Sequence, residues 1–137
     1  MKLFLTYLLL ACAAPAMAQA LPGGIDKDIR VQTQEELKTT VSALEEAVKL
    51  KPAEVDLRVK LGFAYTRLGK ADEAQRAFES AVSLDPKKAI AHYMLGLVYE
   101  KKGLTVQALA AWKACLDNTL YPRMRDTAKR HIHHLSH

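Results

Sequence analysis

The chain has 137 residues, enough for one domain, and half of them are hydrophobic. Its formal net charge is +5, from 20 Lys/Arg and 15 Asp/Glu. The excess lies at one end: residues 101–137 hold seven Lys/Arg and two Asp/Glu, whereas residues 19–100 hold 12 and 13. This distribution argues against a uniformly basic surface, and no nucleic-acid partner is expected.

Residues 1–18 have the pattern of a secretory signal peptide. A positive first segment precedes an apolar run, Leu3–Ala14, that is too short to span a bilayer comfortably. Small residues before Ala18 and Ala20 offer cleavage sites after either position. We therefore expect export, with the bacterial periplasm as the destination. A retained anchor and a lipid-modified Cys12, which ends a weak lipobox, are the alternatives.

The next segment, residues 19–32, is expected to be a flexible leader because it opens with a Pro-Gly-Gly turn signal and carries only scattered apolar residues. Thr33 and Glu36 have the spacing of a capping box, which predicts the start of a helix. An amphipathic stripe continues to about Leu50, and Pro52 then ends the helix.

Residues 55–88 and 89–122 match each other at an offset of 34 residues. The matching pairs are Leu61/Leu95, Gly62/Gly96, Tyr65/Tyr99, Gly69/Gly103, Ala74/Ala108 and Phe78/Trp112. Each copy is predicted to hold two helices, at Glu54–Leu68 and Ala71–Leu84, then at Ala89–Lys102 and Thr105–Asn118. The second glycine of each copy suits a left-handed helix end, and Thr105 is a candidate N-cap.

Both ends of this array differ from the repeats. Residues 33–52 align with a second helix that has no first helix, so the array begins on a half repeat. Pro122 and the apolar positions after it lie two residues later than the period requires. We therefore expect a longer loop at residues 118–122 and then a capping helix at about Met124–Leu135, whose polar back protects the last core stripe.

The recurring order of Leu-Gly, Tyr, Gly, Ala, aromatic and Pro resembles the tetratricopeptide repeat family. The resemblance implies an all-α, short helical solenoid. Its parts are a half repeat (33–52), two repeats (55–88 and 89–122) and a capping helix (123–137). It also implies a non-catalytic protein-binding scaffold. The sequence contains no phosphate-binding loop or catalytic motif, so neither enzymatic activity nor a cofactor is expected.

In this family the binding surface is a concave groove lined by the first helices of the repeats. The resemblance assigns the following residues to the groove: Asp56, Val59, Phe63, Thr66, Arg67, Ile90, Tyr93, Leu97, Glu100 and Lys101. The five apolar ones lie on a face other than the Leu-Gly-Tyr stripe, which favours an apolar or amphipathic partner segment. Coverage of this face by the C-terminal helix or the leader is the alternative.

One subfamily clamps a carboxylate with Lys and Asn at two groove positions. Val59 and Phe63 stand at those positions here, so carboxylate clamping is not expected. The last helix carries His131, His133, His134 and His137, at spacings that put pairs on one helix face, as a metal site would need. No Asp, Glu or Cys joins them, and chain ends usually fray, so solvated histidines are favoured over a metal site.

We therefore expect a periplasmic adaptor or assembly factor that binds a segment of another exported protein. One alternative is a metal- or anion-binding accessory protein that uses the basic, His-rich C-terminus. The other is a subunit that self-associates through the open side of residues 33–50. Membrane contact is expected only through the signal peptide or the lipobox. Cys115 aligns with Ala81, a small core position, so a buried, unreactive thiol is expected.

Overall fold

The computed structural model describes residues 28–137; the predicted signal peptide, Cys12 and residues 19–27 of the leader lie outside the described residues. Residues 28–137 form a short 3₁₀ helix and six α-helices, with no β-strand. They are η1 (Ile29–Val31), α1 (Gln34–Leu50), α2 (Val55–Arg67), α3 (Ala71–Leu84), α4 (Ala89–Lys101), α5 (Thr105–Asn118) and α6 (Pro122–Leu135). Within this part, none of the helices combines the length and the apolar character needed to cross a membrane.

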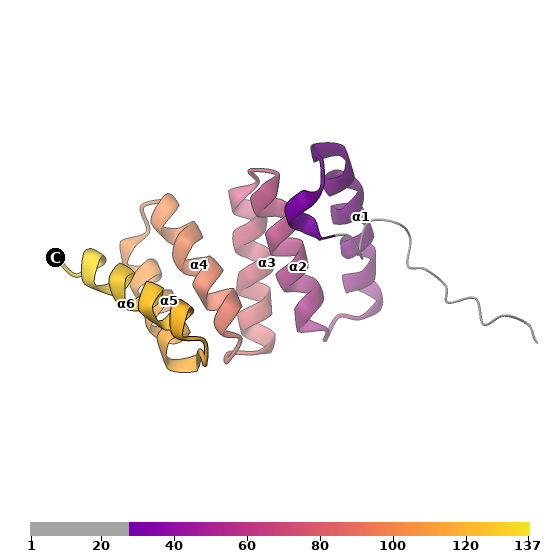
Figure 1. Cartoon of the computed structure of the whole chain (residues 1–137). Coiled ribbons are helices and arrows are strands. Elements are labelled where there is room, and N and C mark those ends of the chain that lie inside the picture. Colours follow the sequence, from indigo (N-terminus) through magenta and orange to yellow (C-terminus); the bar gives the residue numbers. More distant parts are fainter. Residues whose placement is uncertain (1–27) are drawn as a thin grey trace, which may run out of the picture.

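Each helix packs against the helices before and after it in the sequence, so the chain forms a row of antiparallel helices (Figure 1). The second helices of the repeats are α1, α3 and α5, and the first helices are α2 and α4, followed by α6. Three core clusters succeed one another along the row, centred on Leu44, Phe78 and Trp112. This is the predicted all-α solenoid.

Local signals set most of the helix ends. The Thr33 hydroxyl accepts a hydrogen bond from the Glu36 amide at 3.3 Å, and the Glu36 carboxylate accepts one from the Thr33 amide at 2.7 Å. The predicted capping box is therefore confirmed. Gly69 and Gly103 have φ of +73° and +71°, a conformation in which a side chain would be strained. These two turns fold α3 and α5 back along α2 and α4.

Two predicted helix ends are wrong. Thr105 is the first residue of α5 and not its N-cap, because Leu104 occupies the cap position and makes no side-chain bond there. Pro122 does not close the second repeat. It lies in the first turn of α6, where a helix needs no N–H donor. The loop before α6 is consequently only residues 119–121.

The last residues of the predicted flexible leader have a defined conformation. Asp28 caps η1 by accepting a hydrogen bond from the Arg30 amide at 3.0 Å. Gln32 is buried, and its amide oxygen accepts a hydrogen bond from the Thr40 hydroxyl at 2.6 Å. Ile29 packs on the Leu44 cluster, so η1 lies against α2.

The two matching helical glycines lie directly beneath the two matching aromatic rings. A Cβ atom on Gly62 would lie 2.6 Å from Phe78 Cε1, and one on Gly96 would lie 2.5 Å from Trp112 Cε2. Both distances are well inside van der Waals contact. The glycines therefore let the two helices of each repeat approach so closely that the ring fills the space of a missing side chain.

Gly96→Ala should lower the free energy of unfolding by about 1–3 kcal/mol, because the new methyl group overlaps a fully buried indole ring. The loss should appear even though alanine is the better helix former by about 1 kcal/mol. Urea unfolding followed by circular dichroism measures it. The control is Ala110→Leu on the exposed side of α5; a Gly96→Ala variant as stable as this control would contradict the packing described.

A tyrosine–glutamate hydrogen bond also repeats along the row. The Tyr65 hydroxyl donates to Glu45 on α1, and the Tyr99 hydroxyl donates to Glu79 on α3 at 2.7 Å. Burial, and then the hydrogen bond to the carboxylate, raises the pKa of Tyr65 to about 12. The same two causes raise the pKa of Tyr99. Each bond connects a first helix to the second helix of the preceding repeat.

Alkaline pH should therefore destabilise the fold. An unfolded tyrosine ionises near pH 10, so the stabilisation is complete below that pH and is lost as the pH rises through about 12, the pKa of folded Tyr65. We expect the free energy of unfolding, from urea titrations at successive pH values, to fall over this window. The Tyr65→Phe/Tyr99→Phe variant should lose less stability over the same window, and an equal loss in both proteins would contradict the account.

The final helix closes the last core cluster. Ala128 is fully buried, and Ile132 and Leu135 pack with it around Trp112, as Ala91 and Leu95 pack around Phe78. Ala128 and Ile132 lie 37 residues after Ala91 and Leu95, whereas the repeat period is 34 residues. The register of the final helix therefore slips by three residues and not by the expected two. Cys115 is buried in the same cluster, and burial raises the pKa of its thiol to about 11, consistent with the expected unreactive cysteine.

Deletion of residues 122–137 should expose the single tryptophan, Trp112, which is fully buried in the intact chain. We expect a red shift of its fluorescence, a lower Tm and aggregation, because the last core surface then faces water. A soluble, monomeric truncation with unchanged helicity and unchanged tryptophan emission would show that α6 is dispensable for folding.

Candidate functional site

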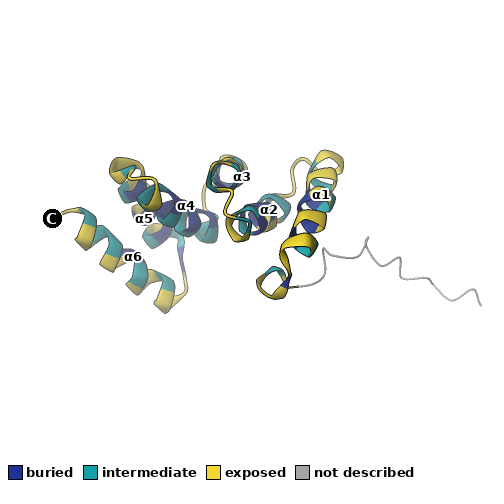
Figure 2. Cartoon of the chain, turned by 90° about the horizontal axis from the view of Figure 1, so that it is seen from above, coloured by how far each residue is buried: buried dark blue, intermediate teal, exposed yellow. Residues whose placement is uncertain are grey.

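The first helices and α6 line the inner side of an arc. Seen from above, the row of helices curves, with η1 and α6 at the two ends of the inner side (Figure 2). α2 and α4 lie between them. The predicted groove positions are on these two helices, and the structure adds η1 and α6 as the groove's two borders.

Partly buried apolar side chains form the floor of the groove. Phe63 on α2 packs edge-on against Phe78, with ring centroids 5.7 Å apart, and Tyr93 on α4 packs edge-on against Trp112 at 5.1 Å. Both rings are thus held by the core while part of each remains exposed. Ile90 and Leu97 are partly buried in the same way. No hydrogen bond occupies the Tyr93 hydroxyl within residues 28–137, so it can serve a ligand.

Val59 differs from the other predicted groove residues. Its side chain is only 7% exposed and packs in the Phe78 cluster, together with Ala91 and Met94 of α4. The family resemblance assigned Val59 to the groove face, but its side chain is buried in a cluster that includes residues of α4. Val59 therefore supports the floor from below and offers a ligand almost no surface.

The charged groove residues divide into paired and unpaired groups. The Asp56 carboxylate forms an ion pair with the Lys88 ammonium group at 2.6 Å. A Glu100 carboxylate oxygen lies 2.8 Å from Nδ1 of His131. Arg67 and Lys101, at equivalent ends of α2 and α4, are exposed and have no carboxylate partner in the described part of the chain. The paired acids leave the rim of the groove with an excess of cations.

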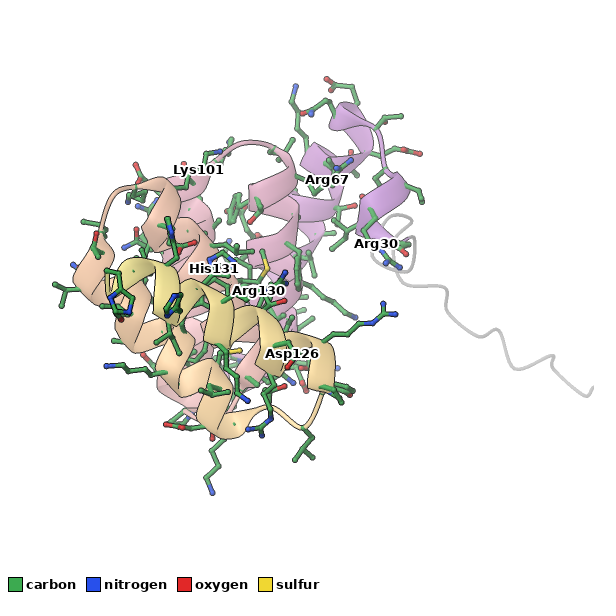
Figure 3. The ribbon with its side chains drawn as sticks, turned by 60° about the vertical axis from the view of Figure 1, so that its left-hand side comes forward. Arg30, Arg67, Lys101, Asp126, Arg130 and His131 are labelled. Carbon is green, nitrogen blue, oxygen red and sulfur yellow. The ribbon has the colours of Figure 1, made fainter. Side chains whose placement is uncertain are left out.

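Arg130 on α6 adds a further cation that the sequence analysis did not assign to the groove. Figure 3 shows Arg67 and Lys101 at the ends of neighbouring helices, with Arg130 and His131 on α6. Arg130 donates a hydrogen bond to the Thr127 hydroxyl at 3.2 Å. It lies 37 residues after Tyr93, which is the register of the final helix. The three-residue slip concealed this position from the sequence pattern.

Among residues 28–137, the chain itself covers the inner side of the arc at the two borders, whereas residues 19–27 of the leader lie outside the described residues. At one border His131 stacks on Trp112, with ring centroids 4.3 Å apart and planes 16° apart, and binds Glu100. At the other, Arg67 reaches the Arg30 carbonyl at 3.5 Å. Between these contacts the floor residues remain partly exposed.

The C-terminal histidines do not act as one group. His131 faces the core, whereas His133 and His137 contact each other at the exposed end of α6, with ring centroids 4.6 Å apart. Among residues 28–137, no three His, Cys, Asp or Glu side chains converge in a way that could hold a metal ion. The structure thus separates His131 from His133 and His137.

The structure is that of a short helical repeat protein whose first helices line the inner side of an arc (Figure 2). A sequence profile for the family described as TPR repeat matches residues 64–103, from the second half of α2 to the turn after α4. The resemblance to the tetratricopeptide repeat family is thereby confirmed: the chain carries this repeat and has the fold of this family. No curated protein matches the chain by sequence.

Solved structures of other tetratricopeptide repeat proteins superpose on the chain. A thermophilic TPR protein from Thermus thermophilus gives a TM-score of 0.63 at 22% identity, over 72% of this chain and 51% of that one. The Sgt2 TPR domain from Aspergillus fumigatus gives 0.62 at 23% identity, over 75% and 72%. The first TPR of Spaghetti (RPAP3), bound to the HSP90 peptide SRMEEVD, gives 0.66 at 16% identity, over 76% and 85%. The chain thus spans about half the length of the Thermus protein.

Proposed function

We propose that the protein is a non-catalytic interaction module that binds an amphipathic, acidic segment of another protein in the groove between η1 and α6. One observation carries the proposal. Partly exposed apolar side chains form a floor between helices that already bury another face, and the cations at the rim have no carboxylate partner among residues 28–137. Such a surface fits a segment with apolar side chains on one face and carboxylates beside them.

The groove favours a mode of binding other than carboxylate clamping. The Spaghetti (RPAP3) domain, with a similar fold, holds an HSP90 peptide. In this chain Val59 is buried and Phe63 packs against Phe78, so neither position offers a donor for a terminal carboxylate. Apolar contact with Phe63, Ile90, Tyr93 and Leu97 then supplies the main binding energy, and the rim cations orient the segment and speed its association.

The cellular setting is the second part of the proposal. The apolar N-terminal run and the small residues before Ala18 support export, and hence an exported partner. An adaptor or assembly factor in the periplasm is the role that fits a small scaffold with one groove. Fractionation of cells that express the full chain, with N-terminal sequencing of the exported form, tests this part separately from the groove.

Site-specific photo-crosslinking tests the binding site itself. A photoreactive phenylalanine analogue replaces Thr66 or Lys101, which are exposed at the rim, and Lys113 on the exposed side of α5 as the control. In living cells the two rim positions should give the same adduct, and position 113 should not. Equal crosslinking at all three positions, or none at the rim, would contradict the proposal.

Reversal of the rim charge gives a quantitative prediction. Lys101→Glu/Arg130→Glu should weaken binding of the crosslinked segment by at least about tenfold, with the larger effect at low salt. Fluorescence anisotropy of a labelled synthetic segment measures the Kd. The matched control, Lys70→Glu/Lys113→Glu, makes the same charge change at exposed positions outside the groove. The proposal predicts that Tm is unchanged in both variants and that affinity falls only in the first.

A further inference from the structure

A second surface lies at the ends of the helices and meets the groove floor at Ile90. Three connections lead from a second helix to the next first helix: residues 49–54, 84–88 and 119–125 with the adjoining helix ends. Because successive helices are antiparallel, all three connections lie along the same edge of the row of helices, at the bottom of Figure 1. We call this surface the corner edge.

The corner edge holds most of the exposed apolar side chains. Six large apolar residues are well exposed in the described part of the chain, and four of them are at these corners. Leu50 is 83% exposed and Leu84 is also exposed. At the third corner Leu120 and Tyr121 are adjacent, 92% and 72% exposed. Two adjacent exposed side chains of this size at the third corner indicate a contact surface, whereas Leu50 and Leu84 stand singly at the other two corners.

The corner edge also carries the net charge of the structure. Its three segments contain six Lys/Arg and two Asp/Glu, whereas residues 28–137 contain 18 and 14 in total. The remainder therefore holds 12 of each and is neutral. Lys49 and Lys88 pair with Glu46 and Asp56. The other four cations, Lys51, Lys87, Arg123 and Arg125, have no carboxylate partner within residues 28–137.

The third corner combines both properties most closely. A depression of about 540 Å³ lies between the loop and the start of α4. Ile90, Leu120, Tyr121 and Met124 line it, together with the two lysines that precede α4, Lys87 and Lys88. An apolar wall beside two ammonium groups suits a ligand with an anionic head and a hydrocarbon body.

We propose that the corner edge docks on the surface of an anionic phospholipid bilayer, with Leu120 and Tyr121 inserted below the headgroups. The unpaired cations contact the lipid phosphates, and the tyrosine hydroxyl stays at the polar interface, where this side chain is enriched. The proposal adds a membrane contact to the N-terminal one that the sequence analysis expected. It does not depend on occupation of the groove.

The arrangement of the apolar side chains favours a bilayer over an acidic protein. Consecutive corners are separated by two interhelical distances, roughly 20 Å in total, so the side chains stand apart in one row. A protein partner gains most from a contiguous, closely packed centre. A fluid surface needs only that the inserting side chains reach the same plane, as the single row of corners allows.

Labelling at the edge tests the proposal in the full chain. An environment-sensitive nitrobenzoxadiazole dye is attached to Leu120→Cys or, as the matched control, to Val106→Cys, which is 78% exposed at the opposite end of α5. Cys12→Ser removes the other accessible thiol, and Cys115 is buried. Because the readout is local, it reports insertion at the label whatever the N-terminal segment contributes.

With vesicles of phosphatidylglycerol and phosphatidylethanolamine, the dye at position 120 should shift to the blue and the dye at position 106 should not. Phosphatidylcholine vesicles should give neither shift. Lys87→Glu/Arg123→Glu should reduce the apparent partition coefficient at least about tenfold, and Lys70→Glu/Lys113→Glu should leave it unchanged. No shift at position 120, or equal shifts at both positions, would overturn the proposal. An equal shift with soluble polyglutamate would assign the edge to an acidic polypeptide instead.

Discussion

The distance between the two helices of each repeat is set by an aromatic ring that lies on a glycine. Phe78 covers Gly62 and Trp112 covers Gly96, and in both cases a single Cβ atom has no room. The close approach determines where the next first helix can pack, because the other side of each ring contacts that helix. Glycine is a poor helix former, so its presence at both sites is explained by this contact and not by local conformation. The groove floor depends on it too, since Phe63 and Tyr93 rest edge-on against these two rings.

The sequence predicted the helices well because their signals are local. The capping box at Thr33 and the left-handed glycines involve residues close together in the chain. Two local predictions, Thr105 as an N-cap and Pro122 as the end of the second repeat, were wrong. The other errors concern contacts between distant residues. Val59 was assigned to the groove through the family resemblance, but its side chain is buried in a core cluster that also contains Ala91 and Met94. The ordered end of the leader likewise depends on Thr40, eight residues beyond Gln32. The groove's helices could be predicted from the sequence, but its borders could not.

α6 packs on Trp112 much as α4 packs on Phe78. In the packing around Phe78 the next first helix contributes Met94, and in the packing around Trp112 the corresponding residue is His131. The second repeat has Trp112 where the first repeat has Phe78. The buried indole N–H of Trp112 has no hydrogen-bond partner in the described chain, which costs about 1–3 kcal/mol. The stacked imidazole and its bond to Glu100 offset part of that cost and position α6 at the same time. The histidine that sequence analysis grouped with possible metal ligands is thus a packing residue.

The geometry of the repeat also explains how two surfaces can coexist on so small a protein. The groove runs across the sides of α2 and α4, whereas the corner edge is made of helix ends and connections. Surfaces on the sides and on the ends of the same helices face in directions about at right angles. A bilayer at the corner edge therefore leaves the groove open to a segment that approaches parallel to the membrane. Both surfaces follow from the same row of antiparallel helices, because the repeat that stacks the first helices side by side also brings every second connection to one edge.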